Sequence, residues 1–278
     1  MRELLIIDPQ IDFCSPDGAL YVEGADQDMV RLAAMVASER FECERITVTM
    51  DQHVKHHIAH GICWKDSEGN HPDPFTTITA ADVKNGKWTP LTDDPNSDDD
   101  LEWAIHYCEE LERKGKYTLM IWPEHCLIGS PGACIYPALY AALQIWQSRN
   151  GKDVVWIPKG EDPSTEMYSA VKPEVQPEPD ENWEDSELAD LLEDTDCDDV
   201  LVAGEALSHC VKATVEDMTD KLYDSIAIIK LVLLTDATSP VTLAKEAADA
   251  FVKEMVEKGM RKAATVDYYR PIIKHGIE

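Results

Sequence analysis

The stretch Val200-Leu-Val-Ala-Gly-Glu-Ala-Leu-Ser-His-Cys-Val211 contains a short apolar run, a turn of small residues and the start of a predicted helix. The run Val200–Ala203 is typical of a parallel strand that is covered on both faces. Cys210 stands where the next helix should begin, and the N–H groups at a helix amino terminus lower a thiol pKa. Backbone N–H groups of Ala206 and Cys210 are candidate donors to an oxyanion. Taken alone, Cys210 is more typical of a small buried core cysteine.

Similar apolar runs recur along the chain and alternate with segments of helical periodicity. The expected strands are 4–7, 45–50, 117–122, 154–157, 200–203 and 231–234, with 263–266 as a further edge candidate, and the expected helices include 27–41, 137–148, 185–193 and 242–258. Such alternation favours right-handed crossovers and a parallel sheet with helices on both faces. We therefore predict a three-layer α-β-α fold of the α/β class with a mostly parallel six-stranded sheet. Residues 1–278 are expected to form a single domain, with insertions at about 61–116 and 161–197.

Polar or reactive residues follow several of these expected strands. In open parallel sheets, ligands bind beyond the carboxyl ends of the strands. The residues concerned are Asp8, Asp51, segment 122–125, Lys159 and turn 204–210. This placement favours a single site at one edge of the sheet.

Asp8, Lys159 and Cys210 together suit nucleophilic catalysis. A cysteine nucleophile needs a base that takes its proton and a cation that stabilises the charge. A carboxylate and a partly desolvated lysine supply both. Taken alone, Asp8 is also compatible with a residue that caps a turn, and Lys159 with a residue on the surface.

A second set of residues suits a divalent metal. Asp51 and His53 lie two apart and so project on one side of an extended segment. With His125 they form an Asp/His/His set compatible with Zn²⁺, Fe²⁺ or Mn²⁺, of which we favour zinc. His57 is a candidate fourth ligand, whereas His56 and His60 are expected on a solvated surface or behind the ligands.

Composition narrows the classes of partner. The net charge of −29 argues against nucleic acid and anionic membranes, because both carry phosphates that this surface would repel. Eight cysteines occur without a CxxC pair, and no basic and apolar leader is apparent. We expect a cytoplasmic homo-oligomer with reduced thiols that acts on a small-molecule substrate.

The blocks around these residues resemble the isochorismatase-like cysteine hydrolases, and the nicotinamidase branch in particular. The matching blocks appear in family order: Leu5-Ile-Ile-Asp8-Pro-Gln-Ile-Asp12-Phe13-Cys14, Asp51-Gln-His53, Trp122-Pro-Glu-His125-Cys-Leu-Ile-Gly-Ser-Pro-Gly-Ala133, Pro158-Lys159-Gly160 and Ala203-Gly-Glu-Ala-Leu-Ser-His-Cys210-Val. The resemblance extends from residue 1 to about residue 260. It departs from the family at Val54-Lys55-His56, where a proline-containing run is usual, so the resemblance assigns no fourth ligand.

The resemblance implies a role for each of these residues. Asp8 would be the general base, Lys159 the lysine of the triad and Cys210 the nucleophile. Asp51, His53 and His125 would hold a metal that binds the ring nitrogen of a nicotinamide-like substrate. Phe13 and Trp122 would sandwich the ring, Tyr168 would line the pocket, and a cis peptide would join Glu205 to Ala206.

The resulting prediction is a metal-dependent cysteine amidohydrolase of NAD salvage that converts nicotinamide and water to nicotinate and ammonia through a thioester on Cys210. Two alternatives stay open at this point. The insertions would admit a different small carboxamide or carbamoyl compound on the same triad. A catalytically silent binding or assembly protein on this scaffold is the rival from another class.

Overall fold

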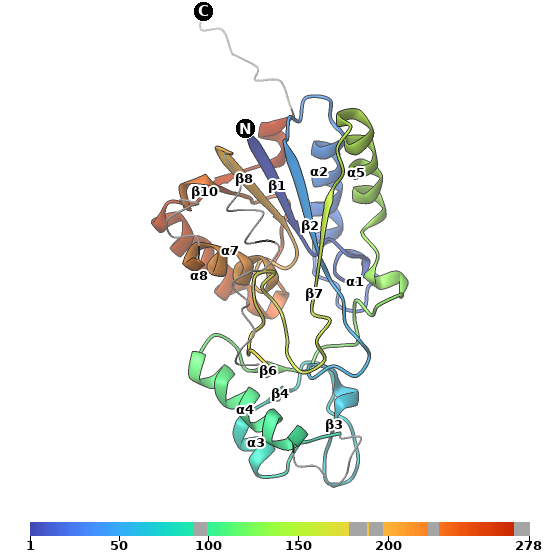
Figure 1. The fold of residues 1–278 in the computed structure, drawn as a ribbon, viewed down its shortest axis with the longest axis vertical. Coiled ribbons are helices and arrows are strands. Elements are labelled where there is room, and N and C mark those ends of the chain that lie inside the picture. Colours follow the sequence, from blue (N-terminus) through green and yellow to red (C-terminus); the bar gives the residue numbers. More distant parts are fainter. Residues whose placement is uncertain (92–98, 178–187, 189–196, 222–227, 270–278) are drawn as a thin grey trace, which may run out of the picture.

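A twisted six-stranded parallel sheet forms the centre of the protein, as the computed structural model in Figure 1 shows. The structure describes residues 1–91, 99–177, 188, 197–221 and 228–269. The strands lie in the order β10-β9-β8-β1-β2-β7 and every pair is parallel. Their bounds are Arg2–Ile7 for β1, Arg45–Asp51 for β2, Val155–Lys159 for β7, Asp199–Gly204 for β8, Leu231–Leu234 for β9 and Arg261–Ala263 for β10. The predicted α/β fold with a parallel six-stranded sheet is thereby confirmed.

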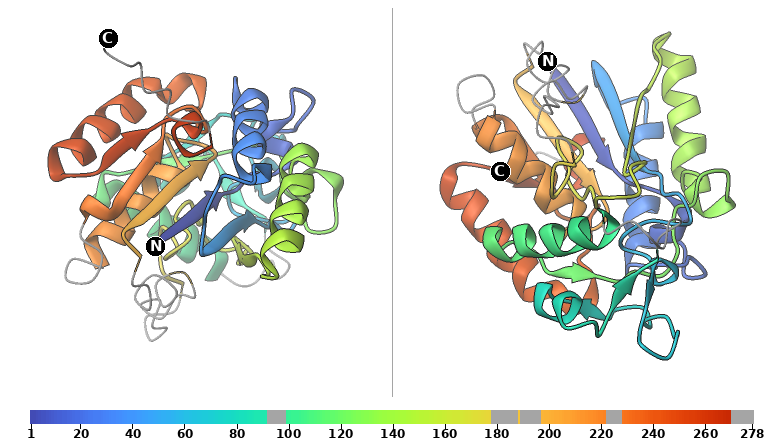
Figure 2. Two further views of the ribbon diagram at one scale, coloured as in Figure 1. Left: turned by 90° about the horizontal axis from the view of Figure 1, so that it is seen from above. Right: turned by 60° about the horizontal axis from the view of Figure 1, so that its bottom comes forward.

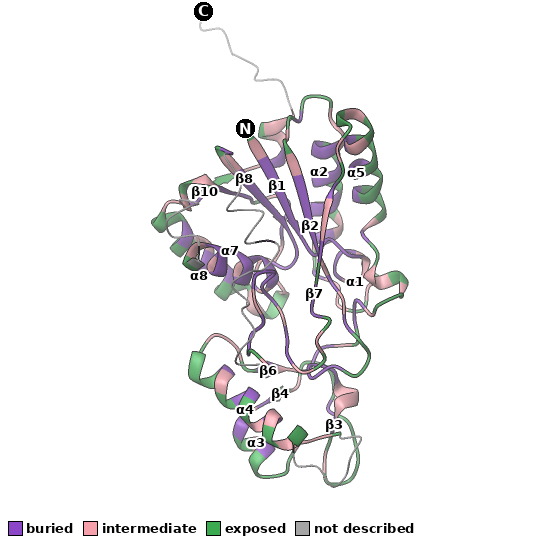
Figure 3. Ribbon diagram, viewed as in Figure 1, coloured by how far each residue is buried: buried purple, intermediate pink, exposed green. Residues whose placement is uncertain are grey.

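Strand β1 shows why the sheet must be covered on both faces. Its side chains alternate, so Leu4 and Ile6 pack into one hydrophobic cluster while Leu5 and Ile7 pack into the other. Almost the whole strand is buried, as its colour in Figure 3 shows. A continuous apolar run is what a parallel strand between two helical layers requires.

Helices cover the two faces in pairs. Helices α2 (Ala25–Ala37) and α5 (Pro137–Asn150) pack against one face and against each other, and α7 (Cys210–Lys221) and α8 (Lys245–Lys258) cover the opposite face. Figure 2 shows these two pairs on either side of the sheet. The expected helices at 27–41, 137–148 and 242–258 correspond to α2, α5 and α8. The helix expected at 185–193 lies outside the described residues, apart from residue 188.

The segment between β2 and α5 leaves the sheet and forms the lower part of the molecule in Figure 1. It contains helices α3 (Ala80–Lys84) and α4 (Asp99–Lys114), a 3-10 helix at Pro131–Ala133, and two small antiparallel strand pairs. The pairs join β3 (Trp64–Lys65) to β5 (Thr89–Pro90) and β4 (Thr77–Ile78) to β6 (Leu119–Met120). Helix α1 itself spans Ile11–Cys14 and follows β1.

The prediction of a central strand at 117–122 was wrong. Residues 119–120 pair with β4 outside the main sheet, and Trp122 makes only an isolated bridge to His60. The sixth place in the sheet belongs to β10, close to the edge strand expected at 263–266. The apolar run at 117–122 predicts that this segment is buried, but it does not specify which sheet the segment joins. No described helix is long and apolar enough to cross a membrane.

Candidate active site

Four adjacent strands bring the predicted reactive residues to one edge of the sheet. In the order β8, β1, β2 and β7, these strands lead to Cys210, Asp8, Asp51 and Lys159 respectively. Asp51 and Lys159 are register partners at the ends of β2 and β7. Cys210 is the first residue of α7, as the sequence predicts. Parallel register therefore places charges from distant parts of the sequence side by side.

The side chains of Asp8, Lys159 and Cys210 meet in a closely packed, buried group. The Nζ atom of Lys159 lies 2.9 Å from Asp8 Oδ2 and 3.7 Å from Cys210 Sγ. It also donates to the carbonyl of Met167 at 2.8 Å. The hydroxyl of Thr49 donates to Asp8 Oδ1 at 2.6 Å, and the backbone N–H of Asp8 donates back to that hydroxyl at 3.1 Å. Asp8 adopts a φ of 46°, a sparsely populated conformation for a residue with a side chain.

Charge and burial set the protonation of this group. Burial raises the pKa of the Asp8 carboxyl, although Lys159 opposes this effect. Burial disfavours the charge on Lys159, but the carboxylates of Asp51 and Asp8 outweigh it and raise the pKa of the ammonium well above its usual value. The resting arrangement is thus an ammonium between carboxyl groups.

The expectation that the helix amino terminus lowers the thiol pKa was wrong. Burial raises the pKa of Cys210 well above that of a free cysteine, and Asp8 and Asp51 add to the rise against the opposing charge of Lys159. Burial and the two carboxylates therefore favour the neutral thiol. The resting sulfur is a thiol, and a thiolate must be formed by transfer of its proton to a neighbouring base.

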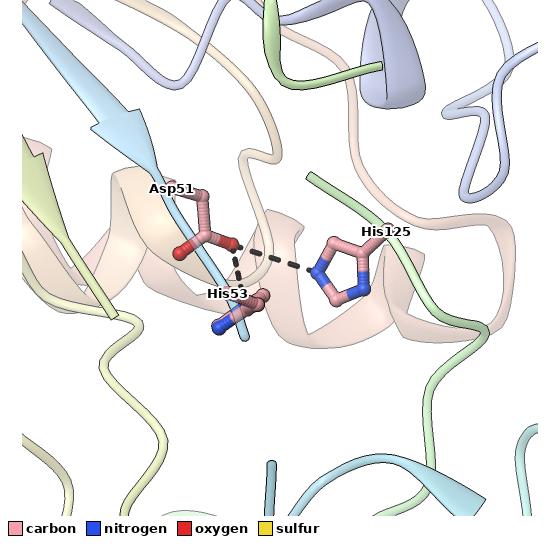
Figure 4. A group of neighbouring side chains, drawn as sticks. All are labelled: Asp51, His53 and His125. Carbon is pink, nitrogen blue, oxygen red and sulfur yellow. Dashed lines mark ion pairs between the residues drawn. The ribbon is translucent and has the colours of Figure 1, made fainter. Parts of the chain in front are cut away.

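Asp51, His53 and His125 form a second buried group beside the first. Their ligand atoms all lie within 4.8 Å of one another. Asp51 Oδ2 is 3.1 Å from Nε2 of His53 and 3.5 Å from Nε2 of His125, the two contacts that Figure 4 marks. The other oxygen, Oδ1, is 3.1 Å from the Nζ atom of Lys159. Burial opposes the charge on Asp51, but His53 and Lys159 outweigh it and hold its pKa well below the usual value.

The hydrogen bonds of the two histidines fit a divalent metal. Nδ1 of His53 bonds the carbonyl of Gly160 at 2.9 Å, and Nδ1 of His125 bonds the carbonyl of Pro123 at 2.8 Å. A carbonyl accepts only from N–H, so in the neutral rings Nε2 carries the lone pair that a metal needs. The buried Nε2 of His53 has no hydrogen-bond partner among the described residues. Two imidazoles and a carboxylate with this geometry form a candidate site for a divalent metal.

A small, mostly apolar pocket adjoins both groups. Its lining includes Phe13, Leu20, Val22, Asp51, Trp122, His125, Glu166, Tyr168, Ala206, His209, Cys210 and Val241. The Phe13 ring lies edge-on to His125 at 5.3 Å, and the indole N–H of Trp122 donates to the hydroxyl of Tyr168 at 2.9 Å. The three aromatic residues expected at the substrate thus line the same pocket as Cys210, Asp51 and His125. Both candidate oxyanion residues, Ala206 and Cys210, also line the pocket, and the peptide between Glu205 and Ala206 is cis.

The sequence analysis missed Glu166. Its Oε1 lies 3.8 Å from Nε2 of His53, and its ligand atoms form a second potential metal group with His53 and His57. The hydroxyl of Tyr107, on helix α4, accepts a hydrogen bond from the Glu166 N–H at 3.1 Å. The available signal was its position two residues before Tyr168, but one acid among many in an acidic segment did not stand out.

The three further histidines occupy different environments. His56 is exposed, as expected. His57 is buried, and both its nitrogens are engaged: Nε2 bonds the Thr165 carbonyl at 3.0 Å and Nδ1 accepts the Ala59 N–H at 3.2 Å. His60 is completely buried, so the solvated alternative for it was wrong. It follows the turn at His57 and directly precedes a short 3-10 helix.

Comparison with known proteins places this site in context. The chain is 26% identical to the nicotinamidase of Saccharomyces cerevisiae over 242 residues, which cover 87% of this chain and 89% of that protein. It is 24% identical to the Escherichia coli nicotinamidase over 259 residues, covering 91% and 90%. No family model matches the chain.

Solved structures show the same fold. The yeast nicotinamidase bound to the inhibitor nicotinaldehyde superposes with a TM-score of 0.64 and 20% identity, covering 95% of this chain and 100% of that one. The pyrazinamidase of Pyrococcus horikoshii in complex with zinc gives a TM-score of 0.55 and 20% identity, covering 95% and 98%.

The six-stranded parallel sheet and the solved structures agree on one fold, which this chain shares with nicotinamidase and pyrazinamidase structures over about 95% of its length. In sequence the chain is similar to nicotinamidases, the name that its three curated relatives carry at 24–26% identity. The resemblance that the sequence blocks indicate is therefore confirmed.

Proposed function

We propose that this protein hydrolyses nicotinamide to nicotinate and ammonia as a metal-dependent cysteine amidohydrolase. The observation that carries the proposal is the contact of Lys159 Nζ with both Asp8 and Cys210, beside a pocket that Cys210 lines together with Asp51 and His125. Relatives named as nicotinamidases over about nine tenths of both chains support the choice of substrate. A catalytically silent scaffold would have no reason to keep a buried ammonium, carboxylate and thiol in contact.

The first half of the reaction forms a thioester. Asp8, whose pKa burial raises, accepts the proton of the Cys210 thiol, and the resulting thiolate attacks the carboxamide carbon. Lys159 stabilises the negative charge on either side of that transfer. Backbone N–H groups of Ala206 and Cys210 are the proposed donors to the oxyanion. As the C–N bond breaks, Asp8 returns the proton to the nitrogen, which leaves as ammonia.

The second half releases the acid. Asp8, again ionised, takes a proton from water, and the oxygen of that water attacks the thioester carbon. The C–S bond breaks, the proton on Asp8 returns to the sulfur, and nicotinic acid leaves and ionises to nicotinate. Each residue thus ends in its starting state.

Asp51, His53 and His125 are the residues that would hold the metal. When bound, the ion supplies a Lewis-acidic position for the ring nitrogen of the substrate. We propose zinc, which suits a set of imidazoles and a carboxylate and which the related pyrazinamidase structure contains. Phe13, Trp122 and Tyr168 would enclose the ring and keep the carboxamide beside Cys210.

Three further properties complete the proposal. The chain would form a single domain, since the segment 61–116 shares the hydrophobic cluster of the sheet through α4 residues such as Tyr107 and Leu111. The protein would act as a cytoplasmic homo-oligomer with no nucleic-acid or membrane partner.

Pyrazinamide is a second candidate substrate, because several structural neighbours are named as pyrazinamidases.

The decisive experiment measures ammonia and nicotinate release by the wild type and by C210A. Loss of the nucleophile should reduce kcat by more than about 10⁴-fold, in line with nucleophile deletions in other hydrolases. The matched control is C134A, because Cys134 is exposed whereas Cys210 is buried. Retained activity in C210A would refute the thiol mechanism. A zinc-loaded wild type that releases no ammonia from nicotinamide or pyrazinamide would refute the substrate assignment.

A further inference from the structure

The buried imidazole of His60 has no role in the reaction described above. Its Nε2 atom is shielded from solvent and has no hydrogen-bond partner among the described residues. The ring centroid lies 5.5 Å from that of His53 and 5.8 Å from that of His125. An unpaired buried nitrogen is costly, so its position beside two candidate metal ligands calls for a ligand.

The tautomer of His60 matches that of the two candidate ligands. Its Nδ1 bonds the carbonyl of Lys55 at 3.0 Å, just as Nδ1 of His53 and of His125 bond backbone carbonyls. In the neutral form of each of the three rings, Nε2 therefore carries the lone pair. His57 shows the opposite arrangement, because its Nε2 donates to a carbonyl and its Nδ1 accepts a backbone N–H. A metal could bind His57 only at the expense of an existing hydrogen bond.

The spacing of the three rings also fits one ion. The centroids of His53 and His125 are 4.8 Å apart, which completes a triangle with the two distances to His60. The point equidistant from all three centroids lies about 3.1 Å from each, close to the ~3.2 Å that a zinc–imidazole bond of about 2.1 Å implies. His60 is not part of the group whose ligand atoms lie within 4.8 Å of one another, so we expect its ring to move toward the ion on binding.

The backbone holds His60 at this position. Its N–H donates to the carbonyl of His57 at 2.8 Å, and residue 60 forms an isolated bridge with Trp122. The N–H of Trp122 in turn donates to the carbonyl of Ala59 at 2.8 Å. The segment that carries His60 is thus fastened to the segment that carries His125.

We propose that His60 is the fourth protein ligand of the metal, binding through Nε2 and completing a set of three imidazoles and one carboxylate. This inference rests on the proposed metal centre at Asp51, His53 and His125. His60 then fills the fourth position, for which the sequence analysis named His57 as the candidate.

The test compares H60A and H60Q with H57A, a matched variant of the neighbouring buried histidine. Each protein is stripped of metal, checked by circular dichroism and thermal unfolding, and titrated with Zn²⁺ against a chromophoric chelator. Each is also loaded with Co²⁺, whose visible spectrum reports the ligand set. Loss of groups that merely orient ligands costs about 10–100-fold in metal affinity, so loss of a direct ligand should cost at least about 100-fold. We expect that loss and an altered Co²⁺ spectrum for H60A and H60Q, and an unchanged spectrum for H57A.

The outcomes distinguish the assignment of His60 from the metal centre on which it rests. Unchanged affinity in the His60 variants, a weakened site with an unchanged Co²⁺ spectrum, or a spectrum altered by H57A alone would each overturn His60 as the fourth ligand. A wild type that binds neither ion would instead refute the metal centre itself. X-ray absorption of the zinc-loaded wild type, which needs no variant, should count three imidazoles; a count of two would reject the inference even if the His60 variants fail to fold.

Discussion

The triad and the histidine cluster lie side by side, yet the chain builds them in different ways. Asp8, Lys159 and Cys210 follow three strands of one parallel sheet, and the register of these strands fixes their relative positions. His60 and His125 come instead from the long segment between β2 and α5, which isolated bridges and single hydrogen bonds hold in place. The triad is therefore a property of the sheet, and the metal cluster is a property of loops fastened to it.

Asp51 joins the two regions, because its two oxygens face different ways. Oδ1 is 3.1 Å from Lys159, and Oδ2 is 3.1 Å from His53. A substitution in the triad should therefore affect the histidine cluster through the Asp51 carboxylate, and a substitution in the cluster should affect the triad in the same way. Lys159 contacts both Asp8 and Asp51, so its removal should disturb the two regions together.

Replacement of Lys159 by methionine should have the largest effect. The substitution leaves two buried carboxylates without their counter-charge, and breaking a buried pair in this way typically costs about 3–5 kcal/mol. We expect a loss of unfolding free energy of that size in urea titrations, together with loss of hydrolysis. The control is K152M, whose partner Glu44 is about half exposed and whose removal should cost less than about 1 kcal/mol. Equal stability of K159M and the wild type would show that the triad does not depend on this charge balance.

Replacement of Gly160 by alanine should disturb the metal cluster more than the triad. Gly160 has a φ of +78°, and an added Cβ would lie 2.7 Å from Asp51 Oδ1 and 2.9 Å from His53 Cε1. Its carbonyl also accepts the hydrogen bond that fixes the His53 tautomer. Because such supporting contacts are worth about 10–100-fold in metal affinity, we expect zinc binding to weaken by that factor.

A matched control separates this contact from backbone strain. Gly151 has a φ of +63° at the end of α5, and a Cβ there would meet nothing within 4 Å. G151A should therefore lose only the roughly 1 kcal/mol that a left-handed alanine costs, with unchanged zinc affinity. If G151A and G160A weaken zinc binding equally, the effect does not come from the contact with Asp51 and His53.

The same difference explains which parts of the molecule the sequence could predict. Strand ends in a parallel sheet are readable because apolar runs end abruptly, as at Ile7 before Asp8 and at Ile157 before Lys159. Residues 117–122 show the limit: the run is buried, but it pairs with β4, and nothing local specifies that partner. The sequence does not predict the burial of His60 for a similar reason, since a run of histidines without periodicity gives no direction for each ring. Its burial depends on the bridge to Trp122, which lies about sixty residues away in the sequence.

The smallest effect we expect is a shift in pH dependence that separates the triad from the metal cluster. Asp8 works as a base only when ionised, and burial raises its pKa, so kcat/KM should fall as the pH drops through a value above that of an ordinary aspartate. The hydroxyl of Thr49 opposes this rise by donating to the carboxylate at 2.6 Å. In T49V the acid limb should therefore move to higher pH, by about one unit for a charged hydrogen bond worth about 1.5 kcal/mol.

The control is T47V, two residues earlier on the same face of β2, and the assays are run at saturating zinc with metal content measured at each pH. A limb that moves with zinc concentration would belong to the histidine cluster, whereas a limb that T49V leaves in place would show that Asp8 is not the group that titrates.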